Sequence, residues 1–114
     1  MEPIRDLSWM TQLAGGEILE RFELSGYSVV SLLVPVHSAQ QGSTYRYRIL
    51  FSEVGDRRPI YAVNLESSIL GEWLITDQKG SEHHIVHRLP SIVSYEQFRV
   101  LALDRAVTKL EKKA

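Results

Sequence analysis

His83, His84 and His87 are the residues whose type and spacing come nearest to a catalytic or metal site. On a helix, His83 and His87 would lie one turn apart on one face, which is a zinc-binding arrangement. The β-branched pair Ile85 and Val86 and the preceding Gln-Lys-Gly turn instead predict a strand. On a strand, His83 and His87 share a face but lie about 13 Å apart. They cannot share a metal ion without another ligand, so the sequence predicts no metal site.

Nucleophilic and acid–base chemistry find no better support. The chain has no cysteine, which excludes thiol catalysis and cysteine metal ligands. No serine stands in a nucleophile-elbow pattern, and Ser94 is better explained as a helix cap. Glu53, Asp56 and Glu66 fall in turns or opposite arginines, where carboxylates are normally solvated or ion-paired. No glycine-rich phosphate-binding pattern is present. We therefore expect no catalytic residue and no cofactor, and we favour a protein that is not an enzyme.

Arg46 and Arg48 alternate with Tyr45 and Tyr47, which suggests a basic and aromatic strip for nucleic acid. On a strand, however, the arginines and the tyrosines point to opposite faces. A base stacked on one of the tyrosines would then have its phosphate away from the arginines. The formal net charge of −1 adds no general attraction to nucleic acid. A weak nucleic-acid surface would use Arg46, Arg48, Arg57 and Arg58, and we rank this function third.

Six predicted strands, in three consecutive hairpins, form the elements that carry these residues. The hairpins join Glu17–Leu24 to Tyr27–Val36, Thr44–Ser52 to Pro59–Glu66, and Gly71–Asp77 to Ser81–Leu89. In the expected registers Phe22 faces Val29, Ile18 faces Leu33 and Leu19 faces Leu32. In the other two hairpins Phe51 faces Tyr61, Arg46 faces Glu66 and Trp73 faces Ile85. The pairing within hairpins does not fix the order in which the hairpins adjoin.

Two helices are expected at the ends of the chain. A short one covers Pro3–Ala14, where apolar residues recur at helical spacing before a Gly-Gly stop. A long one runs from Ser94 to about Lys112, with a capping-box pattern at Ser94 and Gln97. The sequence thus predicts one α+β domain over residues 1–114, with a six-stranded antiparallel sheet between a short N-terminal and a long C-terminal helix.

Composition agrees with such a domain. The 114 residues are 44% hydrophobic and 24% charged, which is typical of a globular protein. The N-terminus has early acidic residues and no secretory pattern. The longest apolar stretch, Val29–Val36, has eight residues, whereas a membrane-spanning helix needs roughly 20. We therefore expect a cytoplasmic protein that does not enter membranes.

The strand Tyr27–Val36 is apolar on both faces, although an antiparallel strand with one wet face should alternate. Six strands make a sheet about 29 Å wide, and two helices about 10 Å across cover one face of it. The second face must curl, meet another subunit or hold a ligand. The favoured function is a non-catalytic interaction domain that binds a second copy or another protein, most simply as a homodimer. Its interface would be a strand edge or the apolar face that carries Val30, Leu32, Val34 and Leu50.

The alternative function is a small-ligand-binding or enzymatic half-barrel. Its pocket would lie between the sheet and the C-terminal helix, where aromatic side chains from several strands meet. It would be lined by Tyr45, Tyr47, Tyr61 and Trp73, with His83 or His87 as the polar group.

Overall fold

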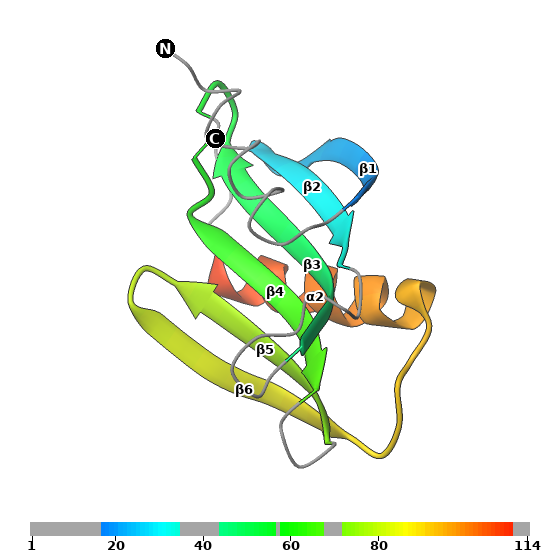
Figure 1. Cartoon of the computed structure of the whole chain (residues 1–114). Coiled ribbons are helices and arrows are strands. Elements are labelled where there is room, and N and C mark those ends of the chain that lie inside the picture. Colours follow the sequence, from blue (N-terminus) through cyan, green and yellow to red (C-terminus); the bar gives the residue numbers. More distant parts are fainter. Residues whose placement is uncertain (1–16, 35–43, 57, 68–71, 111–114) are drawn as a thin grey trace.

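The computed structural model describes residues 17–34, 44–56, 58–67 and 72–110. These residues form a six-stranded antiparallel sheet and a C-terminal helix, as predicted, with the strands adjoining in chain order (Figure 1). The strands are β1 Glu17–Leu24, β2 Tyr27–Leu33, β3 Thr44–Glu53, β4 Tyr61–Ser67, β5 Trp73–Lys79 and β6 Glu82–Leu89, and the helix is α2 Tyr95–Lys109. The helix predicted at Pro3–Ala14 lies outside the described residues.

The tight turns explain why the hairpins close where they do. Ser25 and Gly26, between β1 and β2, both have positive φ, at 53° and 87°. A two-residue turn with positive φ at both positions matches the twist of the strands that it joins. Gly80, with φ 62°, and Ser81 join β5 to β6. The sequence expectation placed this last turn too early: Gln78 and Lys79 belong to β5, because they pair with Ala62 and Tyr61 of β4.

The first register was predicted in part. Phe22 faces Val29 as expected. A bulge at Leu19 then shifts the pairing, so that Ile18 rather than Leu19 faces Leu32. A bulge inserts one unpaired residue into a strand and moves every later partner by one.

The other registers follow the same pattern. Phe51 faces Tyr61 as predicted. A register shift between Tyr45 and Tyr47 places Glu66 opposite Tyr45, so the expected pairing of Glu66 with Arg46 is wrong. The longer β5 likewise places Leu89, not Ile85, opposite Trp73.

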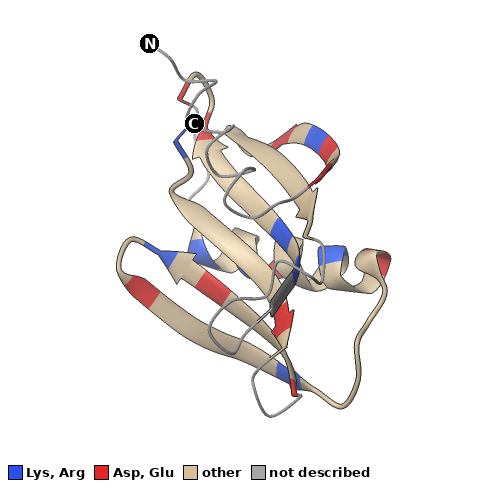
Figure 2. Ribbon diagram, in the orientation of Figure 1, with Lys and Arg blue, Asp and Glu red and all other residues tan. Residues whose placement is uncertain are grey.

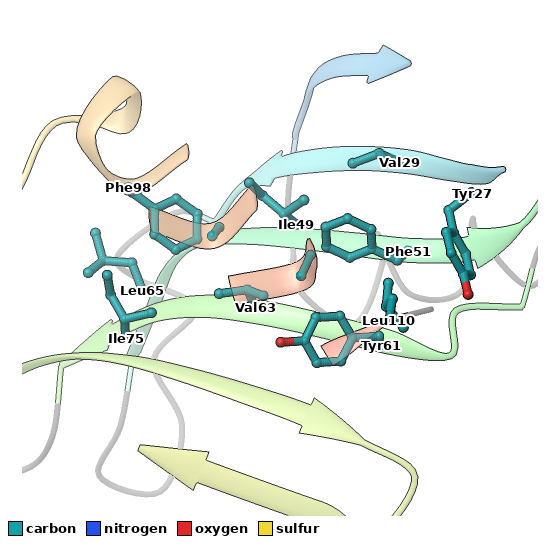
Figure 3. Packing of buried hydrophobic residues seen from close by; sticks show 12 residues of the cluster. Tyr27, Val29, Ile49, Phe51, Tyr61, Val63, Leu65, Ile75, Phe98 and Leu110 are labelled. Atoms are coloured by element: carbon teal, nitrogen blue, oxygen red, sulfur yellow. The ribbon is translucent and has the colours of Figure 1, made fainter. Parts of the chain in front are cut away.

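Helix α2 covers one side of the sheet, which we call the helix face. Ser94 forms the predicted capping box with Gln97, and Phe98, Ala102 and Ala106 are buried along one side of the helix. They pack on β3 and β4 in the middle of the sheet, in a cluster that extends to Tyr27 on β2 and Ile75 on β5 (Figure 3). Spacing by four residues places these three side chains one above another, so the helix presents a continuous apolar stripe.

Candidate functional site

The four residues predicted as an interaction surface are hydrophobic and buried. Val30, Leu32 and Leu50 pack with Ala62 in a cluster separate from the core beneath α2. This cluster lies on the opposite side of the sheet, which we call the second face. Each of the three, and Val34, is at most 8% exposed within a single chain. Three of the four predicted residues therefore come together, and all four are too buried to offer an exposed apolar surface to a second copy.

A polar network occupies the part of the second face formed by the middle of β3, β4 and β5. Arg48 donates from Nε to Asn64 Oδ1 at 2.8 Å and from Nη2 to Gln78 Oε1 at 3.0 Å. Asn64 in turn donates from Nδ2 to Thr76 Oγ1 at 3.2 Å. Asn64 is fully buried and Thr76 is nearly so. Hydrogen bonds offset the cost of burying these amide and hydroxyl groups, so the network fixes the strands in register.

Glu66 extends this network to β6. Thr76 Oγ1 donates to Glu66 Oε2, and His83 Nε2 lies 3.5 Å from the same oxygen. In a catalytic triad the imidazole contacts the hydroxyl, whereas here a carboxylate lies between the two groups. Thr76 is only 2% exposed, so its hydroxyl is withdrawn from any substrate in solution. The arrangement therefore gives no nucleophile.

On the helix face, a cluster around Asp77 fastens α2 to the sheet. Tyr61 Oη donates to Asp77 Oδ2 at 2.8 Å, and Arg105 Nε of α2 donates to the same oxygen at 2.9 Å. Burial opposes the ionisation of Asp77, but the hydrogen bonds from Arg105 and Tyr61 and the charges of Arg105 and Lys109 lower its pKa. Burial and the contact with Asp77 raise the pKa of Tyr61. His84 Nδ1 lies 3.6 Å from the other oxygen of Asp77.

A second cluster, around Glu20, fastens the other end of α2. Arg99 Nε donates to Glu20 Oε2 at 2.6 Å, and Tyr95 Oη donates to the same oxygen. Burial opposes the ionisation of Glu20, but these two hydrogen bonds and the Arg99 charge hold its pKa below the usual value. Burial and the Glu20 contact raise the pKa of Tyr95 to about 12. The Arg99 guanidinium also lies 4.9 Å from the ring centroid of Phe22. Each cluster thus joins a strand carboxylate to an arginine of α2.

The aromatic residues predicted to line a pocket instead belong to the packed core. Tyr47 stacks on Phe98 with 5.8 Å between ring centroids, and Tyr61 is almost fully buried. Trp73 is partly buried against the same core. The side chain of Tyr45 lies outside the described part of the structure. The side chains of Tyr47, Tyr61 and Trp73 thus fill space between the sheet and α2.

The two histidines of the predicted pocket lie on opposite faces of the sheet. His83 faces Gln78 and belongs to the second face, whereas His87 faces Ile75 of the core beneath α2. Residues directly opposite one another in antiparallel strands point to the same side. The expectation that His83 and His87 share a face was therefore wrong. Its physical cause is a bulge at Val86, which reverses the alternation between them.

Two clefts lie elsewhere. One, of about 360 Å³, is between the sheet and the C-terminal end of α2, and its lining includes Tyr27, Phe51 and Val107. The other, of about 570 Å³, lies beside β1, β2 and β3 and has Val30 and Leu50 in its lining. The described linings contain none of the aromatic or histidine residues predicted for a pocket.

Each of the three described arginines predicted for nucleic acid has a partner within the chain. Arg48 is engaged in the polar network, and Arg46 lies over the ring of Tyr47 at 5.5 Å from its centroid. Arg58 forms an exposed ion pair with Asp56 at 3.4 Å. Arg57 is outside the described residues. Figure 2 shows basic and acidic residues interspersed along the described ribbon.

The two edge strands, β1 and β6, are the remaining candidate surfaces. Each pairs with a single strand among the described residues, and each contains a bulge, at Leu19 and at Val86. An edge strand presents unpaired backbone groups that can accept another strand. All residues of β6 are exposed except Val86 and Leu89, and Ile85 is 50% exposed. Figure 1 shows β6 as a long yellow strand with no other described element beyond its outer edge.

Charge distinguishes the two edges. β1 carries three glutamates and one arginine among its eight residues. β6 carries one residue of each sign, Glu82 near its start and Arg88 near its end, with neutral or titratable side chains between them. Charged side chains on an edge discourage pairing with a further strand. β6 is therefore the less protected edge when its histidines are neutral.

Within the described ranges, no three histidine or carboxylate side chains are grouped as a metal site would require. No helix of this part of the chain is long and apolar enough to span a membrane. The chain matches no family model, no curated protein and no solved structure. The function is accordingly argued from the geometry of these surfaces.

Proposed function

We propose that this protein is a non-catalytic domain that forms a homodimer through the outer edge of β6. The two β6 strands would pair antiparallel about a two-fold axis, so that the two sheets join into one. The observation that carries this proposal is an eight-residue edge strand that is almost entirely exposed and has no net charge when its histidines are neutral. Unpaired backbone donors and acceptors along such an edge gain hydrogen bonds when another strand is added.

A second copy is the occupant that the charges of β6 favour. In an antiparallel pair, the Glu82 end of each strand lies beside the Arg88 end of the other, so both ends gain an opposite charge. Ile85 of one copy lies near Ile85 of the other at the centre. Pairing two β1 strands would instead bring two segments of net negative charge together. Val30, Leu32, Val34 and Leu50 are buried within one chain, so the proposed interface uses the exposed edge strand instead.

The dimer is expected to be weak. One pair of short strands buries less surface than a standard protein–protein interface, so we expect a Kd of roughly micromolar order. Sedimentation equilibrium over a wide range of concentration should then show a monomer–dimer equilibrium.

Ile85→Lys tests the proposal, with Leu19→Lys as the matched control. Both replace a partly exposed aliphatic residue of a bulged edge strand by lysine, since Ile85 is 50% and Leu19 is 39% exposed. We expect Ile85→Lys to raise the Kd of the dimer at least about tenfold, because two lysines would then lie close together near the two-fold axis. Leu19→Lys should leave it unchanged. A wild type that stays monomeric, or equal effects of the two changes, would overturn the proposal.

The alternative is a ligand-binding domain, and the cleft of about 360 Å³ beside α2 favours it. That size lies within the range of small-molecule sites, and Tyr27, Phe51 and Val107 make the lining largely apolar. An apolar fluorescent dye should then bind wild-type protein and bind Val107→Glu less tightly. Equal binding by both proteins would exclude this cleft as the site.

A further inference from the structure

We infer that acid dissociates the β6 dimer through the histidines of β6, an inference that rests on the proposed homodimer. His83, His84 and His87 are three of the four histidines of the chain, and all three are exposed on this edge strand. Histidine is the side chain that ordinarily gains a charge between pH 8 and pH 5. Protonation of these three side chains would add positive charge along the edge.

Antiparallel pairing places these charges close together. Ile85 lies near the centre of β6, with His83 and His84 on one side and His87 on the other. His84 faces Asp77 and His87 faces Ile75, so both lie on the helix face, and the two-fold axis therefore sets His84 of each copy opposite His87 of the second copy. Like charges directly opposite one another in adjacent strands destabilise the pair. Because the dimer is symmetric, each such pair of opposed charges occurs twice, and the repulsion between the two copies is doubled.

The neighbouring charges identify the histidines that matter most. Glu66 lies 3.5 Å from His83 and can balance its charge within the same chain. His84 lies 3.6 Å from Asp77, but Asp77 is already held by Arg105 and has Lys109 nearby. A charge on His84 is therefore balanced less completely than a charge on His83.

His87 faces an apolar residue, Ile75, and no ion pair of His87 appears among the described residues. Its neighbour Arg88 is paired with Glu72 at 3.1 Å, so that carboxylate is already engaged. The charges of His84 and His87 therefore carry the repulsion across the axis.

Sedimentation equilibrium at about pH 7.5 and about pH 5.5 tests this inference. We expect the Kd of the wild type to rise at least about tenfold in acid. A His84→Gln, His87→Gln double variant should change less than about threefold, while His83→Gln should behave like the wild type. Far-UV circular dichroism at both pH values checks that each protein stays folded. Asp77 and Glu20 remain ionised at the lower pH, because their pKa values are held below normal.

The outcomes separate the inference from the proposal on which it rests. A wild type that is monomeric at about pH 7.5 overturns the proposed dimer itself. A dimer with the same Kd at both pH values leaves the dimer standing and overturns the histidine switch. Acid dissociation that persists unchanged in the double variant also overturns the switch, because another group would then carry it.

Discussion

β1 and β6 occupy equivalent places at the two edges of the sheet, and both contain a bulge, yet among the described side chains only β1 forms an ion pair with the helix. Its Glu20 accepts hydrogen bonds from Arg99 and Tyr95 of α2. On the other side of the sheet the corresponding carboxylate, Asp77, belongs to β5, one strand inside the edge. The ion pair of Arg105 with Asp77 thus joins the helix to β5, and β6 reaches this cluster through His84, whose Nδ1 lies 3.6 Å from the other oxygen of Asp77. The comparison indicates that one edge is committed to the fold, whereas the other is left available.

Acidification should produce the largest loss of stability, because it protonates the carboxylates of both clusters, Asp77 and Glu20. The pKa values of Asp77 and Glu20 are lower in the folded protein than their usual values of 3.8 and 4.5. Their contribution to stability is thus complete above these values and is lost as the pH falls through the lowered folded values. Urea unfolding followed by circular dichroism should show stability falling below about pH 4. Constant stability down to about pH 2 would contradict the role given to both clusters.

Asp77→Ala should be the most damaging single change. It leaves the Tyr61 hydroxyl without its buried partner and removes the anion that pairs with Arg105. We expect the free energy of unfolding to fall by about 3 kcal/mol, as for other broken buried pairs. Asp104→Ala, at an exposed position of the same helix, should change it by less than about 0.5 kcal/mol. If urea titrations show equal losses of stability for the two variants, the role given to the Asp77 cluster is wrong.

Glu20→Gln should have a smaller effect, because its cluster is more exposed. The side chains of Glu20 and Arg99 are 31% and 36% exposed, so solvent screens their attraction. We expect a loss of about 1 kcal/mol in the free energy of unfolding. Glu23→Gln, further along the same strand and exposed, is the matched control and should be nearly neutral. If Glu20→Gln lowers the free energy of unfolding as much as Asp77→Ala does, the difference drawn between the Glu20 and Asp77 clusters is wrong.

The hairpins and the C-terminal helix could be predicted because short-range chemistry determines them. Ser25-Gly26 closes the first hairpin and Ser94 with Gln97 caps α2, and each signal lies within a few residues. The bulges at Leu19 and Val86 could not be predicted in this way. Alternation of apolar and polar residues locates a strand but does not show where one residue is left unpaired.

The polar network of the second face was missed for a related reason. Asn64 alternates with Val63 and Leu65, a pattern that normally marks a strand with one wet face. In the structure Asn64 is buried and finds its partners on the adjacent strands, at Arg48 and Thr76. Such pairing depends on the order of the strands, which hairpin signals do not specify. From the sequence, an exposed strand edge could be predicted only as one of several possible interfaces, and β6 could not be singled out.

Amide hydrogen exchange at low and high protein concentration tests the proposed β6 interface most directly, because it reports the two edges separately. A β6 homodimer predicts that outward-facing amides around His84 and Ile85 exchange more slowly as the concentration rises. Amides of β1 should exchange at a rate that does not depend on concentration. Exchange in β6 that is equally fast at every concentration, or slowing confined to β1, would contradict the proposal.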